Sequence, residues 1–171
     1  MKTLLEQDNP LLRGIAEPVS SAEFGSDWLK ELANELITIM QKENAVGVAA
    51  PQIGINKRII VFGTDYTQSR KVDHPIPDTV LINPAFKKLS DEIETGYEGC
   101  LNCGDIMGEV TRLLEIEYSG YDLEGNLITK KANGLEARII QHEVDHLDGI
   151  LFIDRVENKD SFTTKTELRS K

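Results

Sequence analysis

The chain has 171 residues, of which 40% are hydrophobic and 28% are charged, a balance that is typical of one folded domain and excludes disorder over most of its length. The net charge of −10 repels phosphate backbones and anionic lipid surfaces, so neither a direct nucleic-acid role nor a membrane partner is expected. No apolar run approaches the roughly 20 residues of a membrane helix, and no basic segment followed by an apolar stretch opens the chain, so we expect a cytoplasmic protein.

The first predicted helix begins at Ser26 and runs through Gln41, after an opening segment that prolines keep extended. Its apolar residues recur at helical spacing, with polar residues between them, which predicts that one face packs on the core. They are Leu29, Leu32, Leu36 and Met40. The sequence therefore predicts an N-terminal amphipathic helix.

Short apolar runs broken by glycine and proline predict strands over 58–62, 79–82 and 110–118. Turn residues within 121–128 predict a hairpin. Because strands and helices do not alternate regularly, we expect an α+β fold with mostly antiparallel sheets.

A second, C-terminal helix is predicted to begin at Asn133 and to stop at Gly149. The Asn133 side chain is expected to cap it, with Glu136 reaching back to complete a capping box. This helix carries the pattern H-E-x-x-H over 142–146. We expect the sheets to pack around it.

The two histidines of this pattern predict a metal site. Residues four apart lie on one face of a helix, so His142 and His146 can reach the same ion. Glu143 is not expected to be a ligand, and such a carboxylate can take a proton from an attacking water and return it to the leaving group. The alternative is an amphipathic helix with two surface histidines.

A catalytic site needs a third ligand and keeps a further position open for water. Cys100 is the best remaining candidate, and in this open site Cys103 is expected at the rim, away from the ion. The alternatives are a closed structural site that uses both cysteines and a redox C-x-x-C pair. The long gap from Cys103 to His142 argues against a zinc finger, no thioredoxin-type context surrounds the cysteines, and a closed site leaves Glu143 without a role.

A run of small residues over 45–52 ends in the amide of Gln52, which fits either a peptide groove or a tightly packed loop. Together with EGCL at 98–101 and QHEVDH at 141–146, the segment GVAAPQ at 47–52 resembles the three motifs of the peptide deformylase family. The resemblance covers nearly the whole chain. It implies one catalytic domain over 1–171, with 156–171 as a short polar tail.

The implied activity is removal of the N-formyl group from the N-formylmethionine of nascent proteins, with release of formate. Cys100, His142 and His146 would hold one divalent metal ion, natively Fe²⁺, with Zn²⁺, Ni²⁺ or Co²⁺ as replacements. Glu143 would be the general acid and base, and the Gln52 amide and the Leu101 backbone N–H would stabilise the oxyanion. The substrate-binding residues would be Val46, Gly47, Glu98, Leu135, Arg138 and Ile139.

Two positions depart from the usual pattern of the family. Ala45 stands where glycine is usual, and Asn102-Cys103-Gly104 stands where serine, an apolar residue and proline are usual. We expect these departures to affect rate and substrate range more than the reaction class.

N-formylmethionyl peptides are the implied partners, together with transient contact with the ribosome, although the polar segment after Arg155 does not predict a long basic docking helix. The alternatives to a deformylase are an H-E-x-x-H metallopeptidase and a non-catalytic or auxiliary paralogue that binds protein N-termini.

Overall fold

The structure is a computed structural model that describes residues 2–65 and 74–170. Over these residues the helices are α1 (Asp27–Lys42), α2 (Gly134–Leu147), α3 (Phe152–Arg155) and α4 (Lys165–Arg169). The strands are β1 (Gly47–Ala49), β2 (Ile59–Phe62), β3 (Thr79–Lys88), β4 (Ile93–Gly99), β5 (Ile106–Leu113), β6 (Glu115–Tyr121), β7 (Leu127–Asn133) and β8 (Thr163–Thr164). Short 3₁₀ turns lie at Pro10–Arg13, Ala50–Ile53, Leu101–Cys103 and Lys159–Ser161.

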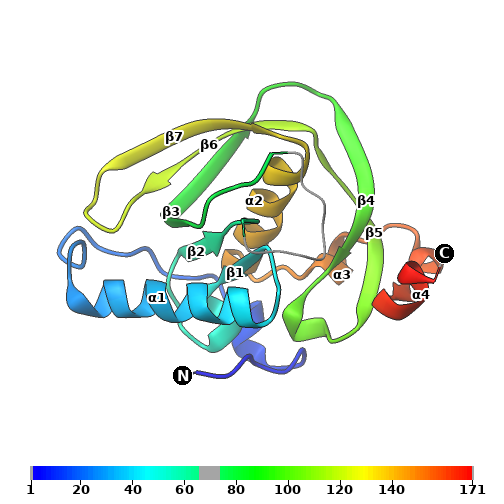
Figure 1. Cartoon of the computed structure of the whole chain (residues 1–171), viewed down its shortest axis with the longest axis horizontal. Coiled ribbons are helices and arrows are strands. Elements are labelled where there is room, and N and C mark those ends of the chain that lie inside the picture. The colour runs from blue at the N-terminus through cyan, green and yellow to red at the C-terminus, as the bar shows by residue number, and fades with distance from the viewer. Residues whose placement is uncertain (1, 66–73, 171) are drawn as a thin grey trace.

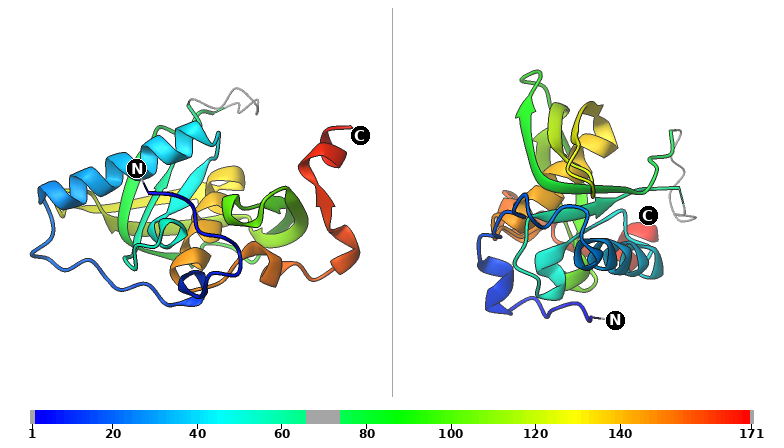
Figure 2. Two further views of the ribbon diagram at one scale, coloured as in Figure 1. Left: turned by 90° about the horizontal axis from the view of Figure 1, so that it is seen from below. Right: turned by 90° about the vertical axis from the view of Figure 1, so that its left-hand side faces the viewer.

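The strands form two antiparallel sheets (Figure 1). The larger sheet has the order β1-β2-β3-β6-β7, and the smaller has the order β4-β5-β8. Helix α2 contacts strands of both sheets, whereas α1 contacts β1 and β2 of the larger one (Figure 2). The expected α+β class with antiparallel sheets is confirmed.

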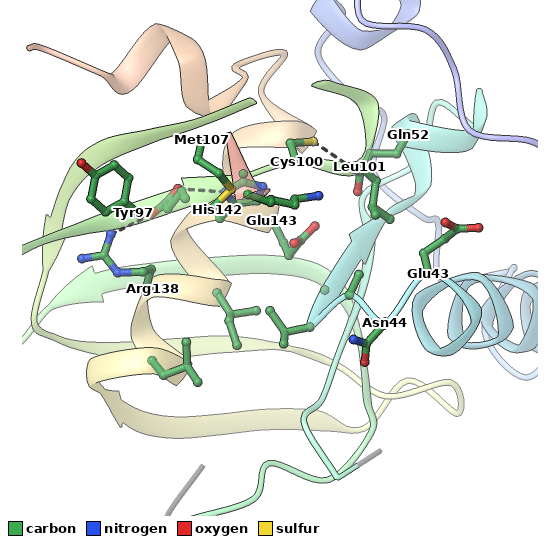
Figure 3. A pocket seen from close by; sticks show the side chains of 18 residues that line it. Glu43, Asn44, Gln52, Tyr97, Cys100, Leu101, Met107, Arg138, His142 and Glu143 are labelled. Carbon is green, nitrogen blue, oxygen red and sulfur yellow. Dashed lines mark hydrogen bonds and ion pairs between the residues drawn. The ribbon is translucent and has the colours of Figure 1, made fainter. Parts of the chain in front are cut away.

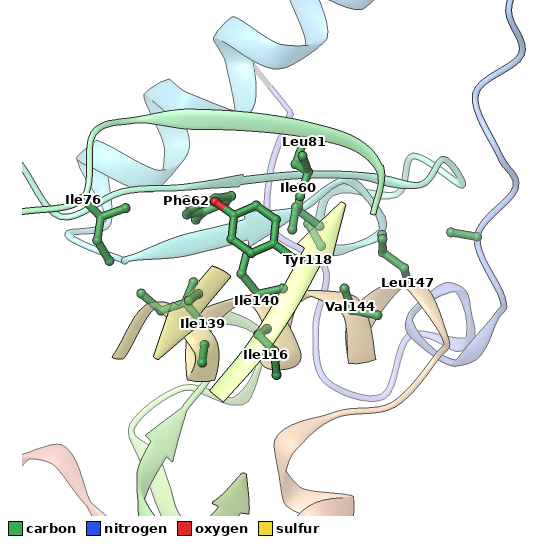
Figure 4. Close-up of a cluster of buried hydrophobic side chains, with 14 residues drawn as sticks. Ile60, Phe62, Ile76, Leu81, Ile116, Tyr118, Ile139, Ile140, Val144 and Leu147 are labelled. Atoms are coloured by element: carbon green, nitrogen blue, oxygen red, sulfur yellow. The ribbon is translucent and has the colours of Figure 1, made fainter. Parts of the chain in front are cut away.

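Strand β2 is buried on both faces, because its side chains alternate between two hydrophobic clusters. Ile60 and Phe62 pack in the cluster that contains the apolar side chains of α2 (Figure 4). Ile59 and Val61 pack in the cluster that contains the buried side chains of α1. The two helices therefore cover opposite faces of the larger sheet.

Helix α1 begins after Ser26, whose hydroxyl accepts a hydrogen bond from the Leu29 backbone N–H at 3.3 Å. Its buried side chains include Leu29, Leu32, Leu36 and Met40, the four apolar residues of the predicted stripe. Among the residues that the structure describes, no helix has the length and apolarity needed to cross a bilayer.

The single strand expected over 110–118 is wrong, because the chain changes sheets at Leu114. Strand β5 ends at Leu113 in the smaller sheet, and β6 begins at Glu115 in the larger one. At the crossing, the Gln141 side chain of α2 pairs with Leu113 as a neighbouring strand would. Its Oε1 accepts from the Leu113 N–H at 3.0 Å, and its Nε2 donates to the Leu113 carbonyl at 2.9 Å.

Other strands also differ from the expected ranges. The strand expected over 79–82 extends to Lys88. Strand β4 (Ile93–Gly99) lies outside the predicted strands. It contains two glycines, and its pairing with β5 places it in the smaller sheet. The chain after Arg155 returns to this smaller sheet, where Thr163 pairs with Met107 of β5.

The capping box expected at the start of α2 is wrong. The Asn133 side chain makes no cap hydrogen bond. Glu136 Oε1 instead accepts from the Tyr118 hydroxyl at 3.0 Å and from Lys130 Nζ at 2.8 Å. Partners on the larger sheet have replaced the local cap.

The pairing of Gln141 with Leu113 should contribute measurably to stability. We expect Gln141→Leu to lower the free energy of unfolding by about 2–4 kcal/mol, because it leaves the N–H and the carbonyl of Leu113 without partners in a partly buried place. Urea denaturation measures this. Gln41→Leu is the control, because Gln41 is exposed and its expected cost is about 0.5 kcal/mol or less. Equal costs for the two variants would contradict this role of Gln141.

Candidate active site

Three candidate metal ligands converge from two segments of the chain. Cys100 directly follows β4, and His142 and His146 lie one turn apart on α2. The thiol sulfur and one ring nitrogen of each histidine all lie within 4.8 Å of one another. Cys100 Sγ lies 3.4 Å from His146 Nε2, and both residues are buried. One sulfur and two imidazole nitrogens in a buried place form a donor set that fits a divalent transition metal.

Glu98 orients one of these histidines. Its Oε2 accepts a hydrogen bond from His142 Nδ1 at 2.9 Å, which fixes the tautomer and leaves the Nε2 lone pair for a metal. Burial alone would raise the pKa of Glu98, but hydrogen bonds from Arg112 and His142 hold that pKa far below its usual range. Glu98 therefore stays ionised inside the protein.

A network of charges surrounds Glu98. Arg112 donates to both of its carboxylate oxygens at 2.9 Å, and Arg138 Nη1 donates to Oε1 at the same distance. Arg112 also donates to Asp145 on α2, and Asp145 accepts two more hydrogen bonds from Arg155, from Nη2 at 2.6 Å and from Nε at 3.1 Å. This network joins the smaller sheet to α2 beside the candidate ligands.

Glu143 is buried, and its Oε2 has no hydrogen-bond partner among the described residues. Burial raises the pKa of its carboxyl group to about 7. A Cβ atom on Gly47 of β1 would lie only 2.4 Å from Glu143 Oε1. The absence of a side chain at Gly47 thus makes room for the Glu143 carboxylate, a role that the sequence pattern did not reveal.

Gln52 lies in the 3₁₀ turn Ala50–Ile53 and is also buried. Its Oε1 accepts from the Ala49 N–H at 2.7 Å, and its Nε2 lies 3.4 Å from Cys100 Sγ (Figure 3). Leu101 begins the turn that follows Cys100 and lines the same pocket. The structure therefore brings the expected oxyanion donors next to the expected ligands.

All the residues expected to bind substrate line one pocket with His142 and Glu143 (Figure 3). They are Val46, Gly47, Glu98, Leu135, Arg138 and Ile139. The pocket also includes residues that the sequence analysis did not single out: Glu43, Asn44, Tyr97, Met107 and Lys165. These side chains come from the residues just after α1, from the smaller sheet and from the start of α4, which approach one another only in the folded chain.

Cys103 lies away from the pocket rim, contrary to expectation. It is 4% exposed and packs in a cluster with Cys100, Val110, Leu151 and Phe152. Over residues 2–65 and 74–170, the group of side chains able to share a metal consists of Cys100 and the two histidines, without Cys103. This grouping favours the open site over the closed one.

Comparisons with known proteins give one consistent result. The model of the polypeptide deformylase family matches residues 1–162. Peptide deformylase 2 of Ralstonia nicotianae is 42% identical over 152 residues, which are 88% of this chain and 84% of the relative. Peptide deformylase 1 of Bordetella pertussis is 39% identical over 160 residues, 93% of this chain and 89% of the relative.

Solved structures agree. A class I type b peptide deformylase from Acinetobacter baumannii, crystallised with Met-Ala-Ser bound, superposes with a TM-score of 0.83 at 35% identity and covers 91% of this chain and 98% of its own. A plant peptide deformylase gives a TM-score of 0.82 at 30% identity over 99% of this chain and 85% of its own.

The two cysteines should differ in their effect on metal binding. We expect Cys103→Ala to keep about one metal ion per chain, since its thiol is outside the ligand group, and Cys100→Ala to lose most of the metal. Elemental analysis after gel filtration measures the content. Similar losses in the two variants would overturn the open site.

Proposed function

The chain belongs to the peptide deformylase family and removes an N-formyl group by hydrolysis, and from this premise we propose that its substrates are the N-formylmethionyl termini of nascent proteins. The observation that carries the proposal is that Cys100, His142 and His146 form one ligand group at the pocket that Glu143 and Gln52 line. The Met-Ala-Ser bound to the Acinetobacter baumannii structure supports a methionyl peptide as the ligand class.

Cys100, His142 and His146 hold one divalent metal ion in this proposal, which makes α2 the metal-binding helix of the fold. Fe²⁺ is the proposed native ion, and the donor set also suits Zn²⁺, Ni²⁺ or Co²⁺. When bound, the metal supplies Lewis acidity and lowers the pKa of a water molecule. Glu98 supports this site because it holds the Nδ1 side of His142.

Glu143 acts first as the general base and then as the general acid of the reaction. Its carboxylate takes a proton from the attacking water and delivers one to the amine that leaves. A C–O bond forms first, and the C–N bond of the formamide then breaks, so the products are formate and a free amino terminus. The Gln52 side-chain amide and the Leu101 backbone N–H donate to the oxyanion that develops on the formyl oxygen.

Strand β1 offers a way to hold the peptide backbone. It is the end strand of the larger sheet and pairs with β2 along one edge. An extended peptide can bind along the other edge, beside Val46 and Gly47. The methionine side chain then enters the apolar part of the pocket, between Leu135 and Ile139.

We further propose that residues 1–171 act as a single catalytic domain in the cytoplasm, with transient contact with the ribosome. The match of the family model to residues 1–162 supports one domain. Helix α4 (Lys165–Arg169) is five residues long, so we assign it no docking role on the ribosome.

The products separate this proposal from a metallopeptidase. Protein purified without oxygen and supplied with Fe²⁺ should release formate from formyl-Met-Ala-Ser and leave both peptide bonds intact. Formate is measured by an enzymatic assay and the peptide by mass spectrometry. Cleaved peptide bonds would indicate the metallopeptidase, and binding without formate release would indicate the non-catalytic paralogue.

Glu143→Gln should separate chemistry from metal binding. We expect kcat to fall by about two to four orders of magnitude, because the variant cannot take up the proton, while the metal content stays at the wild-type level. Glu136→Gln is the control on the same helix, since Glu136 bonds to Tyr118 and Lys130 outside the pocket. A parallel loss of metal in Glu143→Gln would make Glu143 a ligand and refute the assigned role.

Gly47→Ala should act through Glu143. The added Cβ must displace the carboxylate, so we expect kcat/KM to fall by about 100-fold with the metal retained. Gly14→Ala is the control, because its nearest heavy atom is 3.6 Å from the added Cβ and its φ is −84°. If Gly47→Ala keeps wild-type kcat/KM, the close packing of β1 on Glu143 has no functional consequence.

A further inference from the structure

A buried asparagine lies next to the proposed oxyanion donor. Asn102 is the second residue of the 3₁₀ turn after Cys100 and is 6% exposed. Its side chain contacts Gln52 and the backbone of Leu5, and its Oδ1 lies 3.7 Å from Cys100 Sγ. The proposed function assigns Asn102 no role.

Backbone groups fix the orientation of both amide side chains. The Ala49 N–H needs an acceptor, so Gln52 must present Oε1 to it and turn Nε2 toward Asn102. The Leu5 carbonyl needs a donor, so Asn102 must present Nδ2 to it, at 2.7 Å, and turn Oδ1 toward Gln52. The same Nδ2 also lies 3.2 Å from the Gln52 carbonyl, which the Leu5 N–H already serves. The two amides then meet in one arrangement, with Gln52 Nε2 2.7 Å from Asn102 Oδ1.

This arrangement assigns separate tasks to the two hydrogens on Gln52 Nε2. Asn102 Oδ1 accepts one of them. The other is directed toward Cys100 Sγ, 3.4 Å from the nitrogen, and thus toward the candidate metal ligands. A buried amide has no bulk water to hold it in place, so loss of the Asn102 acceptor would leave this orientation unsupported.

We propose that Asn102 is a positioning residue that directs the second Nε2 hydrogen of Gln52 toward the oxyanion. Asn102 does not touch the substrate in this arrangement. The inference rests on the proposed role of Gln52, and it adds that Asn102 orients the Gln52 amide. The N-terminal segment takes part, because the Leu5 N–H donates to the Gln52 carbonyl at 2.9 Å and Asn102 binds the Leu5 carbonyl.

A double-mutant cycle tests whether Asn102 acts through Gln52. We expect Gln52→Ala to lower kcat by about 10²–10³-fold, and Asn102→Ala to lower it by about 10–100-fold with KM and metal content little changed. In the Gln52→Ala background, Asn102→Ala should change kcat by less than about twofold, because its target is gone. If the fall in kcat of the double variant equals the product of the falls in the two single variants, the proposal is overturned.

Asn83→Ala is the matched control for a purely structural asparagine. The Asn83 side chain binds both the N–H and the carbonyl of Val19, at 2.8 and 2.9 Å, and lies outside the pocket. Its loss should lower Tm and leave kcat unchanged. If Asn102→Ala behaves in the same way, Asn102 is structural and the proposal is wrong.

A spectroscopic test on the wild-type protein does not depend on how the Asn102 variant folds. In the Zn²⁺-loaded protein, the side-chain amide signals of ¹⁵N-labelled Gln52 are identified by their absence in Gln52→Ala. The proton that faces Asn102 is identified by its nuclear Overhauser contact with that residue. Titration with formate should shift the other proton and leave this one in place.

A shift of the Asn102-facing proton, or of neither proton at saturating formate, would overturn the proposal. Either of these outcomes can be distinguished from a failure of the proposed function. If wild-type protein releases no formate from formyl-Met-Ala-Ser, the deformylase assignment fails whatever the amide signals show. If it releases formate and the wrong proton moves, only the role of Asn102 fails.

Discussion

The candidate active site depends on one carboxylate that remains ionised inside the protein. Glu98, on the smaller sheet, holds His142 of α2, and it can do so only because Arg112 supplies a matching charge in the same buried place. A buried ion pair costs so much desolvation that it is a poor source of net stability. Its value here is geometric, since the pair sets the position of β4 and β5 relative to the helix that carries the histidines.

Small residues make this crowded arrangement possible. Arg112 stands opposite Glu94 in the β4–β5 register, so Glu94, Gly96 and Glu98 share one face of β4 with it. A Cβ on Gly96 would lie 3.3 Å from Arg138 Nη2, closer than most side-chain contacts. On the opposite wall, Gly47 leaves space for Glu143. Glycines thus lie where charged side chains approach the backbone of a strand.

Sequence analysis predicted the features that depend on residues close together in the chain, and it missed those that depend on contacts between distant segments. The histidine pair with Glu143 could be predicted from local spacing, because helix geometry alone places residues four apart on one face. Cys100 and Gln52 lie far from that helix in the sequence: Cys100 could be proposed as a ligand only from the need for a third donor, and the resemblance to a family made the role of Gln52 specific. The roles of Gln141 and Asn102 escaped prediction because each depends on a backbone group brought near by the fold.

The errors have the same origin. The strand expected over 110–118 had continuous β character, but the chain divides it between two sheets at Leu114, where Gln141 pairs with the neighbouring Leu113. Glu136 does not form the expected capping box, because its carboxylate accepts hydrogen bonds from Tyr118 and Lys130 of the larger sheet instead. The separation of the ligands along the chain also fixes the order in which they are synthesised. Synthesis at about 5–20 residues per second produces the Cys100 thiol seconds before either histidine exists. A partly made chain therefore carries an unpartnered thiol and cannot act on other nascent chains until α2 has been added.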